Sequence, residues 1–178
     1  MEQTFSLQPF PSSQSLPNLK IVGRIERNHN RLTICYNLKG DLQDIAIALP
    51  ANPPARKHEL WQDTCLEFFL GSENSDLYWE FNLSPSGDWN IYRFDGYRQG
   101  MQEEIAFNKL PFKVELAADS LELSVEIDLD KIVAEERAIA VAITAVIKDK
   151  NDEVTYWALT HTGTEADFHR RDSFVIQV

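Results

Sequence analysis

Cysteine and glycine are scarce in this chain, and it contains no long apolar run. The two cysteines, Cys35 and Cys65, are too few for a disulfide framework and lack the spacing of a metal site. Because both lie in apolar, strand-like runs, we expect them to be small buried side chains. With 7 glycines in 178 residues, the chain has no glycine-rich phosphate loop and no nucleophile elbow. No window approaches the ~20 apolar residues of a membrane helix, and the N-terminus lacks the pattern of a signal peptide.

Basic residues are outnumbered, because 17 Lys and Arg stand against 28 Asp and Glu, for a net charge of −11. Nucleic acids and anionic membrane surfaces bind clustered Lys and Arg, so we expect neither a nucleic-acid partner nor a membrane partner. An acidic charge of this kind keeps a protein soluble. The length suits one domain over residues 1–178. Together these features predict an acidic, cytoplasmic protein.

The chain does contain a series of short runs in which apolar and polar residues alternate between turn residues. Alternation with a period of two is typical of a half-buried β-strand. The longest apolar run, Ala138–Ile147, is rich in β-branched residues and predicts a central strand covered on both faces. The pattern predicts an all-β fold, an antiparallel β-sandwich, with a closed lipocalin-like barrel as the alternative. The other predicted strands are Thr4–Leu7, Leu19–Arg27, Leu32–Leu38, Ile45–Leu49, Trp61–Leu70, Tyr78–Leu83, Trp89–Phe94, Ile105–Lys109, Phe112–Leu116, Leu121–Ile127, Val154–Leu159 and Phe174–Val178, and one short helix, capped by Asp128, is predicted over Asp128–Arg137.

The stretch Trp61–Leu70 combines a tryptophan, two acids and a block of apolar residues. Alternate residues from Leu66 to Leu70 are apolar, which predicts the core face of a half-buried strand. Trp61, Asp63 and Glu67 are then expected on the opposite face. A tryptophan beside two carboxylates predicts a small-ligand site with an apolar platform and polar contacts.

Tryptophans mark two candidate positions for a sugar. A sugar ring has apolar faces that an indole ring can cover, while carboxylates, amides and Arg side chains hydrogen-bond its hydroxyls. Trp61 and Trp157 each lie at a strand end beside a polar segment, so we interpret them as a candidate platform. The alternative for each is burial in the core. Trp79 and Trp89 are expected to pack against each other across the hairpin around Gly87.

The segment His161–Asp172 is the densest polar cluster in the chain. Its composition indicates recognition of an anion or polar ligand, or a loop held by its own hydrogen bonds and ion pairs. A metal site of His161, Asp167 and His169 is a further alternative, although their spacing matches no tight ligand pattern.

The sequence gives little support for catalysis. A glycosidase needs two carboxyl groups at a set separation, and Glu67 could pair with either Asp63 or Glu80. The sequence does not fix that separation and contains no Cys–His dyad with local support. We therefore predict that the protein is not an enzyme.

A family resemblance runs over most of the chain. The segments that carry it are Trp61–Phe69 (WQDTCLEFF), Tyr78–Asn82 (YWEFN), the hairpin containing Gly87, Tyr156–Leu159 and Asp167–His169. In their order and spacing these segments resemble DOMON-like domains and the related family 9 carbohydrate-binding modules. The resemblance implies a β-sandwich of jelly-roll type that binds sugars in some members and haem in others.

The resemblance also implies which side chains contact a sugar. Trp61 matches the first aromatic residue of the family's sugar platform, and Phe168 takes the place of the second. Glu67 matches an acid that contacts sugar hydroxyls, and the strand position of Glu80 holds a polar contact. With polar neighbours and the second tryptophan included, the predicted ligand-binding residues are Trp61, Glu67, Glu80, Asn82, Trp157, Phe168 and His169.

No cofactor is predicted, with haem and calcium as the alternatives. Haem-binding relatives hold the iron between a Met and a His, so the resemblance implies Met101 with one of three histidines; these are His58, His161 and His169. Calcium would occupy the acidic turns Asp41–Asp44 or Asp149–Glu153, which are otherwise simply solvated.

The sequence thus predicts a non-catalytic module that binds a small ligand, a carbohydrate or polyol, through an aromatic platform with carboxylate and amide contacts. The alternative is a structural or protein-interaction β-sandwich that takes no small ligand and whose aromatic residues are core. A protein partner remains open under either prediction.

Overall fold

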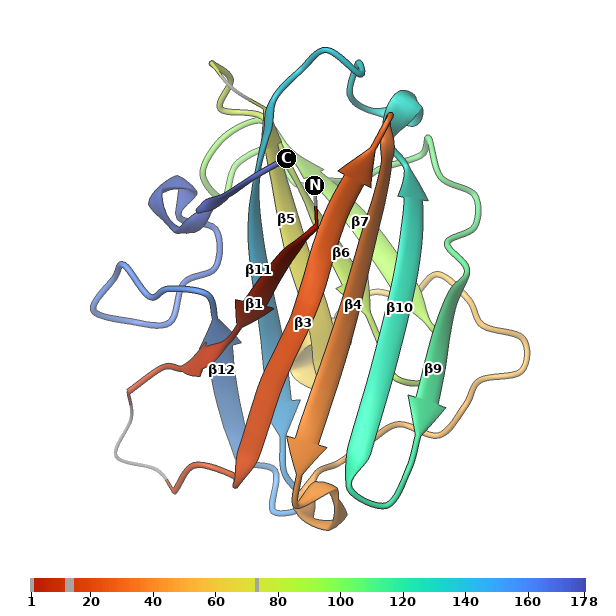
Figure 1. Ribbon diagram of the computed structural model, residues 1–178, viewed down its shortest axis with the longest axis vertical. Coiled ribbons are helices and arrows are strands. Elements are labelled where there is room, and N and C mark those ends of the chain that lie inside the picture. The colour runs from red at the N-terminus through yellow and green to blue at the C-terminus, as the bar shows by residue number, and fades with distance from the viewer. Residues whose placement is uncertain (1, 12–14, 73) are drawn as a thin grey trace.

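The computed structural model describes residues 2–11, 15–72 and 74–178; residues 1, 12–14 and 73 of the predicted domain lie outside this description. Its strands form two antiparallel sheets that pack face to face (Figure 1). In spatial order, the five-stranded sheet contains β1 (Gln3–Ser6), β3 (Leu19–Asn28), β4 (Arg31–Gly40), β10 (Ser120–Asp128) and β9 (Phe112–Leu116). The eight-stranded sheet contains β2 (Gln8–Pro9), β12 (Val154–Ala158), β11 (Ile139–Lys148), β5 (Cys65–Ser72), β6 (Tyr78–Leu83), β7 (Trp89–Phe94) and β8 (Gln102–Glu103), while β13 (Ile176–Gln177) pairs with β11.

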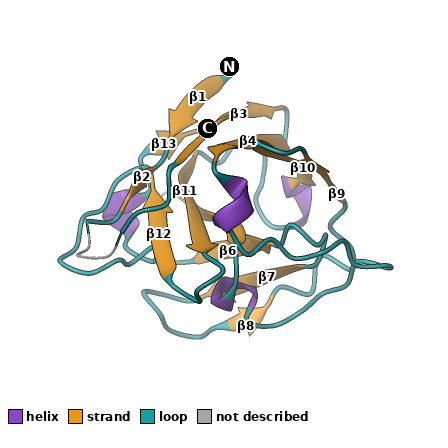
Figure 2. Cartoon of the chain, turned by 90° about the horizontal axis from the view of Figure 1, so that it is seen from below, coloured by secondary structure: helices purple, strands orange, loops and turns teal. Residues whose placement is uncertain are grey.

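This arrangement confirms the predicted antiparallel β-sandwich. The chain crosses from one sheet to the other after β1, β2, β4, β8 and β10, and the sheets remain two layers (Figure 2). The closed-barrel alternative is therefore wrong. The long apolar run forms β11, which lies between β5 and β12 as the predicted central strand.

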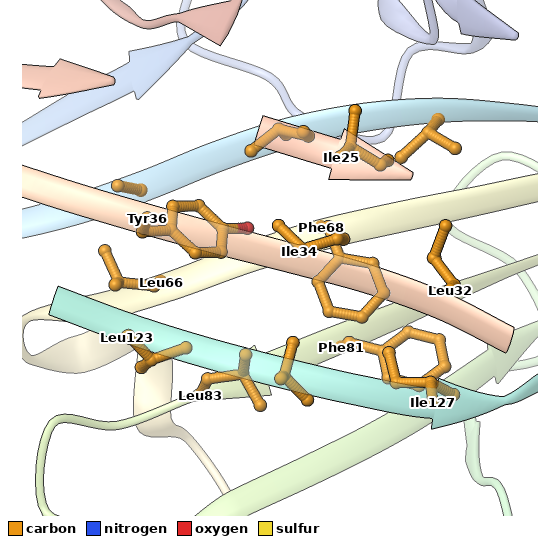
Figure 3. Packing of buried hydrophobic residues seen from close by; sticks show 14 of the residues in the cluster. Ile25, Leu32, Ile34, Tyr36, Leu66, Phe68, Phe81, Leu83, Leu123 and Ile127 are labelled. Atoms are coloured by element: carbon orange, nitrogen blue, oxygen red, sulfur yellow. The ribbon is translucent and has the colours of Figure 1, made fainter. Parts of the chain in front are cut away.

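The core lies between the two sheets and is built from the alternate residues of each strand (Figure 3). Ile34 and Tyr36 of β4 point inward from the five-stranded sheet and are buried. Phe68 of β5 and Phe81 of β6 lie opposite each other in register, and their rings stack at a centroid distance of 4.4 Å. Offset stacking of this kind adds to the free energy gained by burying apolar surface.

Both faces of the eight-stranded sheet are covered, which corrects one expectation from the sequence. Every residue of β6 and all but the last of β5 are buried, so β5 is not the half-buried strand that its alternation predicted. Loops from several parts of the chain cover the outer face, and Phe69, Tyr78, Tyr92, Phe94 and Phe174 form a second aromatic cluster there. Such coverage allows polar side chains on that face to be buried.

The predicted helix Asp128–Arg137 is wrong. Only the 3-10 turn η3 (Leu129–Lys131) forms there, capped by Asp128 through a hydrogen bond from the Asp130 amide. In a helix the Val133 carbonyl would accept from the Arg137 amide, but here it accepts a hydrogen bond of 2.7 Å from the Asn30 side-chain amide. The Arg137 amide donates to the Ala134 carbonyl in a turn instead. The other helical elements are likewise 3-10 turns, η1 (Leu42–Asp44), η2 (Leu60–Gln62) and η4 (Arg171–Ser173).

Two predicted strands are also absent from the described structure. Ile45–Leu49 makes only an isolated bridge from Ile45 to Asp149, and Leu49 is 85% exposed. Ile105–Lys109 is a loop, and the strand in this region is β8, a short strand earlier in the chain. Within the described residues, none of the helical turns has the length and apolar character of a membrane-spanning helix.

Two smaller expectations are corrected as well. Trp79 lies opposite Arg93 and Trp89 opposite Leu83, so the two tryptophans are buried but are not cross-strand partners. Cys35 is half-buried on the outer face of its strand, with its sulfur near a serine hydroxyl, and is not a core residue.

Candidate functional site

A pocket of about 440 Å³ lies on the outer face of the eight-stranded sheet, above β5 and β6. Its volume falls in the range of ~300–1,000 Å³ that is typical of small-molecule sites. Strand residues form its floor, and residues of η2 and of the segments around residues 98–101 and 166–169 form its walls. The lining residues are Trp61, Glu67, Phe69, Glu80, Phe94, Arg98, Met101, Val146, Tyr156, Ala166, Phe168 and His169.

Strand geometry brings the polar floor together. Glu67 of β5 lies opposite Asn82 of β6, and Phe69 lies opposite Glu80. All four side chains point to the same face, because each residue of one pair is two positions from a residue of the other along its own strand. Glu67 and Glu80 are thus diagonal neighbours on adjacent strands, at a spacing within reach of long side chains.

Glu67 is buried with one carboxylate oxygen unpaired. The residue is 2% exposed, and its Oε1 atom has no hydrogen-bond partner in the described structure. Its Oε2 atom is 3.4 Å from the Thr144 hydroxyl, and its backbone carbonyl accepts a hydrogen bond of 2.7 Å from the Tyr36 hydroxyl. The backbone is therefore held firmly from the core side, while the carboxylate faces the pocket with an unfilled acceptor site.

Glu80 is buried in a network of neutral partners. It is 5% exposed, and its Oε1 atom accepts a hydrogen bond of 2.9 Å from the Asn82 amide. Its Oε2 atom faces Nε2 of His169 at 3.8 Å, which is too long for a hydrogen bond. The Tyr78 hydroxyl accepts from the Arg98 backbone amide and lies within hydrogen-bond distance, 2.8 Å, of Nδ1 of His169. In the tautomer whose Nδ1 accepts from Tyr78, the Nε2 atom carries the hydrogen and points it toward Glu80.

Burial shifts the pKa of each of these three groups in the direction that favours the neutral form over the charged form. The pKa of Glu80 is raised to about 7 by burial. The pKa of Glu67 is raised well above its usual value, first by burial and then by the charge of Glu80. Burial lowers the pKa of His169 to about 4, so this imidazole is neutral near pH 7. Groups that are easily charged in water are thus held close to neutrality at the pocket floor.

A carboxylate outside the pocket floor connects two of the walls. Asp167 accepts hydrogen bonds from the Tyr97 hydroxyl and from Arg98, whose Nη2 atom lies 2.9 Å from Oδ1. These hydrogen bonds outweigh the effect of burial and lower the pKa of Asp167. The contact joins the segment after β7 to the segment after β12 at one side of the pocket.

The structure brings most of the predicted ligand-binding residues to this one pocket. Trp61, Glu67, Glu80, Phe168 and His169 line it, and Asn82 lies beneath it as the hydrogen-bond donor to Glu80; these are six of the predicted residues.

Trp157 is in a different place from the one predicted. It is 4% exposed on the inner face of β12, where it belongs to the core and donates from Nε1 to the Thr155 hydroxyl. Asp63 is likewise outside the pocket, because it follows η2 with its side chain exposed and paired with Lys148. The candidate pair Asp63 and Glu67 is therefore not one site, whereas Glu67 and Glu80 are neighbours.

Several lining residues were missed from the sequence. Tyr156 lines the pocket in place of its neighbour Trp157, and Val146 lies opposite it in register on β11. The alternation of β12 could have separated these two aromatic residues had the core face been known. Phe94 ends β7 and Arg98 lies in the loop after it, and both line the pocket. They were missed because no acidic residue of the predicted site lies beside them in the sequence.

The metal and haem alternatives do not fit the residues present. No group of three or more His, Cys, Asp and Glu side chains could hold a metal ion among residues 2–11, 15–72 and 74–178. Asp149 uses its carboxylate to close its own turn, accepting from the amides of Asn151 and Glu153. His161 and His169 have different hydrogen-bond partners, the Gln8 carbonyl for His161 and the Tyr78 hydroxyl for His169.

Met101 and His169 do line the same pocket, as a haem site would require. Both ring nitrogens of His169 face protein groups, however, and two buried carboxylates form the floor. His58 lies beside Tyr92 and Glu103 and is not among the residues that line the pocket. The residues present therefore do not fit haem ligation.

No protein-family model matches the sequence, and a search of curated proteins returned no match. Solved structures do share the fold. A candidate carbohydrate-binding protein from Bacteroides uniformis superposes with a TM-score of 0.63 at 16% identity, over 96% of this chain and 84% of that one. A family 9 carbohydrate-binding module from Caldicellulosiruptor kristjanssonii in complex with glucose gives a TM-score of 0.55 at 13% identity, over 92% of this chain and 77% of that one.

The same type of module in complex with cellotriose gives a TM-score of 0.52 at 12% identity, over 84% of this chain and 70% of that one. At these identities the likeness establishes a shared β-sandwich fold. The relation to DOMON-like domains stays a prediction.

Proposed function

We propose that this protein is a non-catalytic module that binds a small carbohydrate or polyol in the pocket above β5 and β6. The observation that carries the proposal is the Oε1 atom of Glu67, which is buried at the pocket floor without a hydrogen-bond partner. A buried acceptor without a partner costs free energy, and a sugar hydroxyl is a donor that could satisfy it.

The walls suit the other property of a sugar, its apolar ring faces. Trp61, Tyr156 and Phe168 line the pocket and offer aromatic surface beside the polar floor. The Trp61 ring rests edge-on against Tyr92 at a centroid distance of 5.6 Å, which holds the indole in place. Pre-positioned aromatic walls reduce the entropy that must be lost when a ligand binds.

The structures that share the fold support the proposal by analogy, since two of them are modules in complex with glucose and with cellotriose. Under this proposal Glu67, Glu80 and His169 contact hydroxyl groups, and Asn82 holds Glu80 in position. The carboxylates serve as hydrogen-bond acceptors and do not cleave the ligand.

A thermal-shift screen of the purified protein against monosaccharides, disaccharides and polyols tests the proposal. A ligand that binds only the folded state raises the melting temperature by mass action. We expect one class of sugar to raise it, Trp61→Ala to remove the shift and Glu67→Gln to reduce it, while both variants stay folded. Glu115→Gln is the matched control, because Glu115 is exposed on the outer face of the five-stranded sheet.

A shift that survives both Trp61→Ala and Glu67→Gln would place the sugar elsewhere and refute the proposal. A screen without any shift would favour the alternative of a structural or protein-interaction domain.

A further inference from the structure

The two acids at the pocket floor have no cationic partner. Among the described residues, no Lys or Arg side chain forms an ion pair with Glu67 or Glu80, and their hydrogen-bond donors are the neutral side chains of Thr144 and Asn82. Buried carboxylates are normally paired with a positive charge, because an isolated buried charge is costly. The floor therefore lacks a positive charge to pair with the two acids, as well as a hydrogen-bond donor for the Oε1 atom of Glu67.

The basic groups near the floor do not balance the two acids. The charge of Arg98 acts to lower the pKa of Glu80, but its guanidinium is hydrogen-bonded to Asp167 and burial still raises the pKa of Glu80 to about 7. His169 faces Glu80 at 3.8 Å and is neutral near pH 7, because burial lowers its pKa to about 4. The positive charge that would pair with Glu67 and Glu80 must come from outside the chain or be replaced by bound protons.

The pocket walls also suit a cation. Five aromatic residues line the pocket around the acids; these are Trp61, Phe69, Phe94, Tyr156 and Phe168. Aromatic faces attract cations, and the attraction is larger where water is excluded. A protonated amine brings one positive charge and several N–H donors, whereas a hydroxyl brings one donor and no charge.

We infer that the preferred ligand is an amino sugar, with its ammonium group on Glu67 and Glu80 and its ring against the aromatic walls. This inference rests on the proposed function, which requires only that a sugar binds here. The unpaired Oε1 atom of Glu67 accepts from the ammonium. The positive charge favours the ionised form of both carboxyl groups, so any proton that they carry is released to solvent as the ammonium binds. A charge-assisted hydrogen bond is about twice as strong as a neutral one.

Isothermal titration calorimetry with D-glucosamine, D-glucose and N-acetyl-D-glucosamine tests the inference. At about pH 6.5 the amine of glucosamine is protonated, while acetylation removes its charge. We expect glucosamine to bind roughly tenfold or more tightly than glucose, the ratio that separates a charge-assisted hydrogen bond from a neutral one. N-acetyl-D-glucosamine should bind no more tightly than glucose.

Two matched substitutions show whether the acids of the pocket floor cause the preference for glucosamine over glucose. Glu67→Gln and Glu80→Gln should each bring the affinity for glucosamine close to that for glucose, and Glu115→Gln should leave the ratio unchanged. Far-ultraviolet circular dichroism reports that each variant is folded.

The outcomes separate this inference from the proposed function. If glucose binds as tightly as glucosamine and still depends on Trp61, the amino-sugar inference is overturned while the proposed function stands. If the preference for glucosamine survives both Glu67→Gln and Glu80→Gln, the cation lies elsewhere and the inference is overturned. If no sugar binds, both are overturned.

Discussion

Replacing Glu80 by glutamine should stabilise the protein at neutral and alkaline pH. In the folded protein burial raises the pKa of Glu80 from 4.5 to about 7. A tenfold change in an ionisation constant corresponds to about 1.4 kcal/mol, so ionised Glu80 costs the folded state about 3 kcal/mol relative to the unfolded chain. Glutamine keeps the oxygen that accepts from Asn82 but carries no charge.

The pH window follows from the direction in which burial moves the pKa. A carboxyl group with a raised pKa binds its proton more tightly in the folded state, so its contribution to stability is present below pH 4.5 and is lost as the pH rises through about 7. His169 acts in the opposite direction, because its pKa is lowered from 6.5 to about 4 and stability is lost as the pH falls through that range. His169 and Glu67 are present in both proteins, so the difference between the variant and the wild type reports the charge of Glu80, including its effect on the pKa of Glu67.

Urea denaturation from about pH 4.5 to pH 8 measures this difference. We expect Glu80→Gln to match the wild type at the acidic end and to exceed it by up to about 3 kcal/mol at the alkaline end, or ~6–12 °C in melting temperature. Glu115→Gln, which changes an exposed acid, should show no such trend. A difference that is independent of pH, or that grows toward acid, would refute the account of a buried, uncompensated carboxylate.

Two further predictions concern the walls and the core. Trp157→Ala should lower the free energy of unfolding by about 3–5 kcal/mol, as for other large core truncations, and leave the sugar affinity of the folded protein unchanged; a loss of affinity at preserved stability would place Trp157 in the site after all. Asp167→Asn should weaken the hydrogen bonds that Asp167 accepts from Tyr97 and Arg98. Hydrogen exchange of the backbone amides of residues 95–101 should then become faster, and the sugar affinity should fall. Unchanged exchange would show that these hydrogen bonds do not hold the segment.

The fold was largely predictable because strands leave a local pattern. The alternation in β3, β4 and β10 marked the core face correctly, since the other face of that sheet is exposed to solvent. The errors fall where tertiary contacts decide the structure. Asn30, distant in sequence, donates to the Val133 carbonyl, which the predicted helix at Asp128–Arg137 would pair with the Arg137 amide.

The acidic floor of the site was predictable for the same reason. The spacing of Glu67 from Leu66 and Phe68 placed it on the face opposite the core, and the pairing of β5 with β6 brought Glu80 beside it. The choice of Trp157 over Tyr156 was wrong because β11 and β12 are apolar on both faces, so sequence alone does not show which face of β12 is the core. The extent of the domain and its cytoplasmic location stay predictions.

The most direct test of the central claim is an NMR titration that follows the four tryptophan indole N–H signals as a sugar is added, with the Trp61 signal assigned from Trp61→Phe. The account predicts that the Trp61 signal moves with the added sugar and saturates, because Trp61 lines the pocket. The signals of Trp79, Trp89 and Trp157 should hardly move, because all three are buried in the core. A sugar that saturates the protein while the Trp61 signal stays still would contradict the claim that this pocket is the binding site.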